Sequence, residues 1–482
     1  MAPQNANGDK GVLPLIINNE DVVTDNLFEI RNPSTGELAH QCVGASVEDA
    51  NRVAAAAKAA FPGWSKTHPN ERRAIMNKAA DIMFSRKEEF IKTQSEETGA
   101  GRFFAEKTFM MSVAVIRDFA GMLPSVEGKS PVLNDEDQGV LVMKQPYGVV
   151  LGIAPWNAPF ILGVRSVVIP MAAGNTTILK GSELSPKCFW LIGDVFRQAG
   201  LPAGVLNVIY HKTSDASAVT NALIASPAVR KINFTGSTNV GAIVAATAGK
   251  YVKPVLLELG GKASAIVLDD ADLEKAAHNC VLGAFAHSGQ VCMSTERIIV
   301  QRPIAEKFQK KLAESAEKTF GKHVPAPVLV NAGGVKKNKE LVANALEKGA
   351  NTVFGDPQAS ESCPNSMRPI VLGGVTKEMD IYATESFGPT VSLLVVDTEE
   401  EALQIANDTE YGLTSAVFTT NLFRGLRVAK QIETGAVHIN SMTIHDEPTL
   451  PHGGWKSSGY GRFGGTTGYD EWLQTKTITW VE

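Results

Sequence analysis

The sequence predicts an α/β protein built around a doubly wound parallel sheet, and three observations carry this prediction. The chain has 482 residues, more than one hydrophobic core usually serves, so at least two domains are expected. Between residues 148 and 260, short β-branched runs alternate with longer stretches of helical periodicity. The runs are apolar at successive positions, as in parallel strands covered on both faces.

The elements of this region follow one another as strand, turn, helix and turn. Runs of Val, Ile, Leu and Thr bounded by Gly, Pro or Asn predict strands over 148–154, 176–180, 204–210, 229–234 and 254–259. Longer stretches between them, with apolar residues three or four apart, predict helices over 160–174, 187–200, 216–226 and 240–249. Ligands of such a sheet bind at the carboxyl ends of its strands.

Composition excludes several function classes. Hydrophobic residues make up 44% and charged residues 20%, which is typical of a globular protein. With 46 Lys and Arg against 51 Asp and Glu, the net charge is -5 and no long basic run is present, so nucleic acid is not expected as a partner. The longest apolar stretch, 160–174, contains Arg165 and Pro170 and is too short for a membrane span.

Cysteine usage and the N-terminus bear on the compartment and on metals. The five cysteines are scattered and odd in number, which favours a reducing environment over a disulfide framework. No pair is spaced like a zinc knuckle, so no metal is expected. The first residues show no signal or transit peptide, and a cytoplasmic protein is therefore predicted.

Polar residues follow several predicted strands. Asn157 comes after the first strand, and Lys180 and Glu183 lie at the end of the second. After the fourth, Gly236 and Ser237 form a turn that opens a helix, whose free backbone N–H groups and dipole suit a pyrophosphate. The spacing departs from G-x-G-x-x-G, and a purely structural glycine turn stays open as the alternative.

Glu258 and Cys292 are the candidate reactive residues. Glu258 ends an apolar strand before a Gly pair, where a carboxylate is either a solvated cap or, if it faces Cys292, a base with a raised pKa. Cys292 lies in "GQVCMS", a loop between small residues and a strand. A buried structural thiol is the alternative to a nucleophile whose neighbouring backbone N–H groups hold an oxyanion.

Seven stretches together resemble the aldehyde dehydrogenase superfamily, and the resemblance covers nearly the whole chain. They are "PWNAP", "LKGSE", "FTGSTNVG", "LELGGK", "GQVC", "ESFGP" and "LPHGGWKSSGYGRFGG", in the family's order. Within the superfamily, "WNAPFILGVR" and "HDEPTLPHGG" look most like the branch that oxidises salicylaldehyde, vanillin and benzaldehyde.

The resemblance implies a role for each catalytic candidate. Cys292 is the expected nucleophile on the aldehyde carbon, Asn157 with the Cys292 backbone N–H holds the oxyanion, and Glu258 activates the water that hydrolyses the thioester. The cofactor is expected to be NAD rather than NADP, because a carboxylate at Glu183 suits ribose hydroxyls and repels a 2′-phosphate. The implied cofactor residues are Ile153, Pro155, Trp156, Lys180, Ser182, Glu183, Gly236, Ser237, Val240, Leu259, Gly260, Glu385 and Phe387.

Substrate residues are expected on the helix after Asn157 and beside the cysteine. Asn157, Ile161 and Arg165 are four residues apart, so they share one helix face. Ala158 leaves room for a ring, Met293 follows the nucleophile, and Arg165 is expected to reach a ring substituent; a surface ion pair is the alternative for Arg165.

Three positions depart from the commonest family pattern. Gly181 stands where proline is usual, and His287 replaces a frequent asparagine. His452 stands where phenylalanine is usual and is expected to affect local packing rather than chemistry.

The resemblance also implies domains and assembly. The expected parts are an NAD-binding domain over 1–123 and 147–258, an α/β catalytic domain over 259–458, and a small β oligomerisation arm over 124–146 and 459–482. Two strand-like runs, 139–146 and 474–480, lie in the arm, which in the family extends a neighbouring subunit's sheet, so a homodimer or homotetramer is expected.

The alternatives for function are an aliphatic or semialdehyde dehydrogenase, a CoA-acylating dehydrogenase and a non-catalytic binding protein of the same fold. The presence of Glu258 disfavours the CoA-acylating type, and retention of the whole reactive set disfavours a binding protein.

Overall fold

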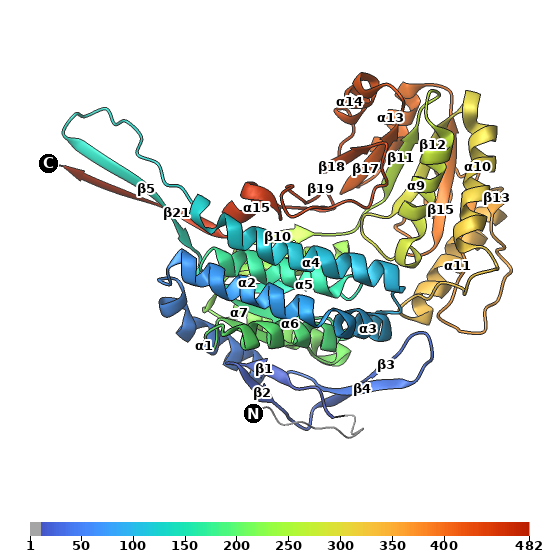
Figure 1. Cartoon of the computed structure of the whole chain (residues 1–482). Helices are drawn as coiled ribbons and strands as arrows, with labels where there is room; N and C mark the ends of the chain where they lie inside the picture. Colours follow the sequence, from blue (N-terminus) through green and yellow to red (C-terminus); the bar gives the residue numbers. More distant parts are fainter. Residues whose placement is uncertain (1–10, 482) are drawn as a thin grey trace.

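The computed structural model describes residues 11–481, and its larger sheet is the one predicted from the sequence (Figure 1). In spatial order its strands are β2 (Glu20–Val22), β1 (Leu15–Ile17), β8 (Leu206–Ile209), β7 (Thr176–Lys180), β6 (Val149–Ile153), β9 (Val229–Thr235), β10 (Val255–Glu258) and β20 (Gly459–Tyr460). From β8 to β10 all neighbours are parallel. The chain order reverses between β6 and β9, which makes their carboxyl ends the expected ligand crevice.

Helices cover both faces of this sheet (Figure 1). They are α1 (Val47–Trp64), α2 (Pro69–Ser85), α3 (Lys87–Thr98), α4 (Arg102–Met122), α5 (Pro159–Ala172), α6 (Pro186–Ala199), α7 (Ala216–Ala225) and α8 (Thr238–Lys250). The doubly wound parallel sheet of the prediction is confirmed, because the predicted strands and helices of 148–260 all form.

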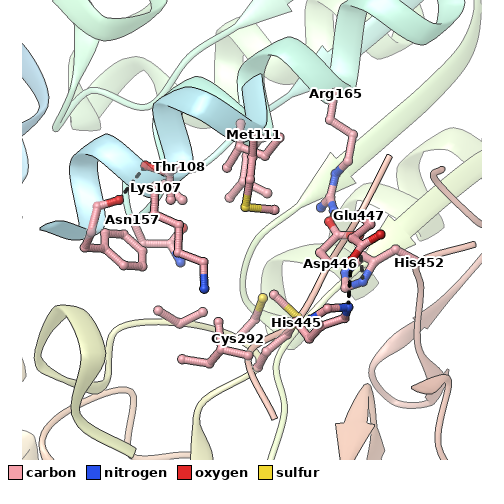
Figure 2. Close-up of a pocket in the computed structure, with 17 residues that line it drawn as sticks. Lys107, Thr108, Met111, Asn157, Arg165, Cys292, His445, Asp446, Glu447 and His452 are labelled. Carbon is pink, nitrogen blue, oxygen red and sulfur yellow. Dashed lines mark hydrogen bonds and ion pairs between the residues drawn. The ribbon is translucent and has the colours of Figure 1, made fainter. Parts of the chain in front are cut away.

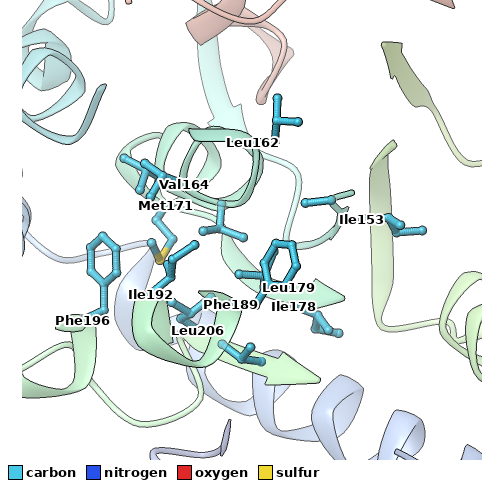
Figure 3. Close-up of a cluster of buried hydrophobic side chains, with 14 of the residues drawn as sticks. Ile153, Leu162, Val164, Met171, Ile178, Leu179, Phe189, Ile192, Phe196 and Leu206 are labelled. Carbon is cyan, nitrogen blue, oxygen red and sulfur yellow. The ribbon is translucent and has the colours of Figure 1, made fainter. Parts of the chain in front are cut away.

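Helix α5 lies in the centre of the first core, and every one of its residues is buried. Its aliphatic side chains pack against α6 and the strands beneath, as Figure 3 shows for Val164, Met171 and Ile192. An arginine on such a helix must find charged partners, because burying an unpaired charge is very costly. Arg165 is that arginine, with 4% of its surface exposed.

The second sheet is also mainly parallel. Its strands are β13 (Asn351–Phe354), β14 (Ile370–Gly373), β15 (Thr390–Val396), β12 (Thr295–Gln301), β11 (Ala263–Val267), β17 (Thr414–Phe418) and β18 (Ala436–Ile439), with β13 antiparallel at one edge. Its helices are α9 (Leu273–Phe285), α10 (Arg302–Phe320), α11 (Ala332–Glu347), α12 (Asp380–Ala383), α13 (Glu399–Asn407) and α14 (Leu422–Ala429). The predicted second α/β unit is therefore present.

Smaller elements complete the fold. The ribbon of β5 (Gln138–Pro146) and β21 (Leu473–Val481) pairs antiparallel and projects away from both sheets (Figure 1). Two further strand pairs join β3 (Leu27–Arg31) to β4 (Leu38–Val43) and β16 (Tyr411–Gly412) to β19 (Trp455–Lys456). The short helices are η1 (Leu123–Ser125), η2 (Thr213–Asp215), η3 (Ala286–Gly289) and α15 (Gly465–Asp470).

The strand-like runs at 139–146 and 474–480 thus form strands, paired with each other. Gly459 and Tyr460 pair with β10, so the ribbon itself starts at Leu473 and not at 459. Between residues 11 and 481, no helix is both long and apolar enough to cross a membrane.

Candidate active site

A cavity of about 280 Å³ lies at the carboxyl ends of β9 and β10, on the side where the strand order reverses. We call it the strand-edge cavity. Its lining residues are Pro155, Trp156, Asn157, Leu162, Thr235, Gly236, Ser237, Glu258, Leu259, Gly260, Cys292, Lys337, Glu385 and Phe387. Eight of the thirteen predicted cofactor residues are in this lining.

The other five lie at the same sheet edge but outside the lining. Ile153 and Lys180 end β6 and β7, Ser182 and Glu183 follow in the next turn, and Val240 lies in the first turn of α8. Burial lowers the pKa of Lys180 to about 8, while Glu183 raises it and so favours the ammonium form. A buried cation beside a carboxylate is a suitable donor and acceptor pair for ribose hydroxyls.

The turn into α8 is built to receive an anion. Ser237 caps the helix, and its Oγ accepts a hydrogen bond of 3.4 Å from the backbone N–H of Val240. A Cβ on Gly236 would stand 2.6 Å from the Phe234 ring, so the turn requires glycine. Partial positive charge at a helix N-terminus suits phosphate groups. The residues at this edge therefore fit a dinucleotide.

A buried carboxylate fixes the loop on the opposite wall. Glu296 accepts hydrogen bonds from the backbone N–H groups of Ser386, at 2.9 Å, and Phe387, at 3.1 Å, and it pairs with Lys262 at 2.6 Å. Phe387 has a φ of 46° and packs edge-on against Trp156. Glu296 and Lys262 thus hold a strained cofactor-side loop, and the sequence reading missed both.

Glu385 belongs to the same loop. Its carboxylate accepts a hydrogen bond of 2.8 Å from the backbone N–H of Gly261. Burial, with the nearby charge of Glu296 adding to it, raises the pKa of Glu385 to about 7. Its charge is therefore sensitive to pH near neutrality.

A second cavity, of about 300 Å³, lies between α4, α5 and the loop before β19 (Figure 2). We call it the α4–α5 cavity. It is lined by Phe104, Lys107, Thr108, Met111, Asn157, Ala158, Ile161, Leu162, Arg165, Val291, Cys292, Met293, Ile444, His445, Asp446, Glu447 and His452. All four predicted substrate residues are among them. Asn157, Leu162 and Cys292 line both cavities, so the thiol lies where the two meet.

The loop that carries Cys292 has an unusual backbone. His287, Ser288 and Gly289 have φ values of 49°, 58° and 72°, a left-handed conformation that costs free energy for residues other than glycine. A Cβ on Gly261 would stand 2.4 Å from the carbonyl oxygen of Cys292, so the turn after Glu258 packs directly against the cysteine. This packing brings Glu258 and Cys292 together.

Asn157 is fixed by the same loop. Its Nδ2 donates a hydrogen bond of 2.9 Å to the carbonyl oxygen of Gln290. That bond uses one N–H of the amide and leaves the other free near the thiol. The backbone N–H of Cys292 makes no hydrogen bond to any of residues 11–481. Two donors are therefore available for an oxyanion.

Charges around the thiol favour a resting pair of protonated Cys292 and ionised Glu258. Burial raises the pKa of the Cys292 thiol, and the negative charge of Glu258 raises it further. Burial alone raises the pKa of Glu258, but His452 and Arg165 outweigh it and the net shift is downward. The expectation of a raised pKa for Glu258 is therefore wrong, because the sequence did not show these two partners.

Comparison with known proteins decides the family. Residues 21–478 match the aldehyde dehydrogenase family. The chain belongs to this family. A vanillin dehydrogenase from Pseudomonas sp. (strain HR199) is 43% identical over 97% of each chain. A salicylaldehyde dehydrogenase from Pseudomonas putida is 38% identical over 96% of this chain and 97% of its own.

Solved structures agree with this assignment. The crystal structure of a salicylaldehyde dehydrogenase from Pseudomonas putida G7 complexed with salicylaldehyde has a TM-score of 0.94 at 37% identity and covers 98% of each chain. An NAD-dependent aldehyde dehydrogenase from Sinorhizobium meliloti has a TM-score of 0.94 at 31% identity, covering 100% of this chain and 97% of its own. This aldehyde dehydrogenase is accordingly an enzyme that oxidises aldehydes.

In this aldehyde dehydrogenase Arg165 contacts the carboxylate of Glu258. Its Nη2 lies 3.4 Å from Glu258 Oε2, its Nη1 lies 3.3 Å from Asp446 Oδ2, and its guanidinium lies 4.4 Å from the centre of the Phe463 ring. The alternative of a surface ion pair is wrong, since the pairs are buried. Both terminal nitrogens face carboxylates, so a ring substituent would share Arg165 with Glu258 and Asp446, and the expected contact with a substituent stays a prediction.

His452 corrects another expectation. Its Nε2 lies 3.7 Å from Glu258 Oε1, and its Nδ1 lies 3.9 Å from Asp446 Oδ1. It therefore contributes to the electrostatics of the site and not only to packing. Asp446 was not singled out from the sequence, although "HDEP" beside the quoted "PHGG" was the signal that could have drawn attention to it.

Proposed function

We propose that this aldehyde dehydrogenase oxidises a ring-substituted aromatic aldehyde to its carboxylic acid, with NAD as the cofactor. The observation that carries the proposal is the position of Cys292 between the two cavities, with Glu258 beside it. One cavity then holds the aldehyde and the other the cofactor, and the thiol reaches both.

The first half-reaction uses groups already in place. The Cys292 thiol gives up its proton to water in the cavity, and the sulfur attacks the aldehyde carbon in the α4–α5 cavity. The free N–H of Asn157 and the backbone N–H of Cys292 hold the resulting oxyanion, which is the largest stabilisation that such sites usually supply. When bound in the strand-edge cavity, NAD supplies the hydride acceptor, and Cys292 is left as a thioester.

The second half-reaction is hydrolysis. Glu258 takes a proton from water, whose oxygen attacks the thioester carbon and releases Cys292. Arg165 and His452 support this role, because they lower the pKa of Glu258 and so keep it ionised as a base.

An aromatic substrate is supported by the α4–α5 cavity and by the relatives. Phe104, Met111, Ile161 and Met293 provide apolar walls, and Ala158 leaves space beside Asn157. The relatives include vanillin and salicylaldehyde dehydrogenases and a benzaldehyde dehydrogenase of Bacillus subtilis at 36% identity. Polar groups gather at one end of the cavity, around Arg165, Asp446 and His452, and suit a ring substituent (Figure 2).

The preference for NAD rests on Glu183, which follows β7 at the sheet edge where a ribose would lie. A panel of substituted benzaldehydes, aliphatic aldehydes and semialdehydes, assayed by reduced-nicotinamide absorbance with NAD and with NADP, tests the whole proposal. Substituted benzaldehydes with NAD should give the highest kcat/KM. A higher kcat/KM with a semialdehyde would contradict the aromatic substrate. A higher kcat/KM with NADP would contradict the preference for NAD.

For assembly we propose a homodimer or homotetramer formed through the β5–β21 ribbon. Support comes from its exposure: most of β21 is exposed, and an isolated two-stranded ribbon is marginally stable alone. The outer edge of β21 pairs with no other strand in the described part of the chain and is open to another copy, whereas β5 is bridged at Val142 by Lys129. The division into a cofactor domain over 1–123 and 147–258, a catalytic domain over 259–458 and an arm over the rest is likewise proposed.

A further inference from the structure

The imidazole of His452 is held in a fixed position between two carboxylates. Its backbone pairs with that of Phe463 in both directions, at 2.6 and 2.8 Å, which anchors the ring. Its side chain is 7% exposed, and it lies 3.7 Å from Glu258 on one side and 3.9 Å from Asp446 on the other. The ring therefore connects the catalytic carboxylate to a second carboxylate nearer the surface.

Two buried polar atoms of this arrangement are without partners. Glu258 Oε1 and His452 Nε2 are both buried, and neither has a hydrogen-bond partner among residues 11–481. The other oxygen of Glu258 already faces Arg165. Buried polar atoms almost always find a partner, from protein or ordered water. A separation of 3.7 Å lets one water contact both atoms, and a small side-chain rotation brings the two atoms into direct hydrogen-bond contact.

We propose that His452 is a proton-relay residue that takes from Glu258 the proton released during thioester hydrolysis. This inference rests on the proposed role of Glu258 as the hydrolytic base. The water oxygen forms a bond to the thioester carbon as its proton moves to Glu258 Oε1. The C–S bond breaks, and its electron pair stays on the Cys292 sulfur. The proton then passes from Oε1 to the Nε2 lone pair of His452 and is released to water when the acid leaves, so that Glu258 is again a carboxylate.

The surrounding charges suit this task. Asp446 faces Nδ1 at 3.9 Å and Glu258 faces Nε2 at 3.7 Å, and the relay requires that the neutral ring carry its proton on Nδ1 and present Nε2 to Glu258 as the acceptor. Once the ring is charged, both Asp446 and Glu258 stabilise it. Arg165 faces the same two carboxylates and opposes the charge, which favours onward release of the proton. The other group beside Glu258 is the Cys292 thiol.

The test separates the relay from a structural role. In His452→Phe the ring is replaced by one of similar size, so the first turnover should give a burst of reduced cofactor at the wild-type rate. The steady-state kcat should fall about tenfold or more, while kcat/KM for the aldehyde stays within about twofold. In His452→Ala, added imidazole should enter the cavity and restore kcat.

The matched control is His40→Phe. His40 also pairs with a buried glutamate, Glu97, at 2.9 Å, and because neither residue lines either cavity its loss should leave kcat unchanged. A kcat for His452→Phe within twofold of wild type would overturn the relay, as would an equal fall in kcat and kcat/KM or the absence of imidazole rescue. Glu258→Gln separates failure of the relay from failure of the proposed role of Glu258. If that variant shows no burst, the proposed role of Glu258 fails. If it shows a burst and His452→Phe keeps the wild-type kcat, only the relay fails.

Discussion

Replacing Arg165 by leucine should slow the oxidation of every aldehyde, not only of hydroxylated ones. Arg165 lies on a wholly buried helix, and its removal leaves Glu258 and Asp446 without their cation. At 3.4 Å and an effective dielectric constant of about 20, the attraction to Glu258 alone is about 5 kcal/mol. Loss of one partner of a buried pair typically costs about 3–5 kcal/mol of stability.

The change also alters the base. Arg165 is one of the groups that lower the pKa of Glu258, so without it that pKa rises and more of the carboxylate is protonated at a given pH. The base works when ionised, and the loss of activity should therefore be greatest at low pH and partly recover as pH rises. We expect kcat to fall about tenfold or more for benzaldehyde, hydroxybenzaldehydes and aliphatic aldehydes alike.

The assay is steady-state kinetics on that panel from pH 6 to 9, with the midpoint of the first thermal transition measured for each variant. Arg165→Lys keeps the charge and should retain more activity than the leucine variant. Arg197→Leu is the control, because Arg197 also bridges two carboxylates, Asp21 and Asp194, away from the site. A raised KM for hydroxylated benzaldehydes alone, with unchanged kcat and pH profile, would refute this reasoning and restore a direct contact with the substrate.

Four further outcomes follow from the geometry. Cys292→Ala should abolish oxidation yet bind NAD with wild-type affinity in a fluorescence titration; residual turnover above background would exclude the thiol as nucleophile. Glu258→Gln should retain the burst of reduced cofactor and lose at least about a hundredfold in steady-state rate; an unchanged steady state would remove it as the base. Because the pKa of Glu385 is raised to about 7 in the folded protein, the folded state holds a proton that the unfolded chain has released between about pH 4.5 and 7, so stability falls as pH rises through this window. In Glu385→Gln the unfolding temperature should fall less between pH 5 and 8 than in the wild type, because that part of the fall is removed. An identical dependence of the unfolding temperature on pH in both proteins would contradict the raised pKa. Deleting 473–482 leaves β5 without its partner and should reduce the mass measured by light scattering to that of a monomer, whereas an unchanged oligomer would place the interface elsewhere.

The sequence was sufficient for the fold and for naming the candidate residues that the structure brings together, because both depend on local patterns. The run of buried strands predicted the sheet, and the positions of Asn157 after one strand and of Glu258 at the end of another placed both at its carboxyl edge. Cys292 was found from its loop and its motif. Each of these inferences uses residues that are near one another in the chain.

The pKa shifts of the site could not be predicted from such local patterns. The pKa of Glu258 depends on Arg165 and His452, which come from separate segments and meet Glu258 only in the folded protein. Burial raises the pKa of a carboxylate and pairing with a cation lowers it, so the direction of the pKa shift cannot be predicted until the partners are known. Glu296 was missed for the same reason, since its backbone partners lie about ninety residues away.

The candidate reactive residues do not all come from one sheet. Asn157 and Glu258 extend from the first sheet, whereas Cys292 precedes a strand of the second. Each sheet has its own hydrophobic core, so a slight separation of the two would leave both cores intact. Hydrogen-bond and ion-pair distances between the halves would nevertheless be lost. The catalytic rate therefore depends on how closely the two halves are packed together. Mild denaturation should abolish activity while the spectroscopic signal of the helices is still unchanged.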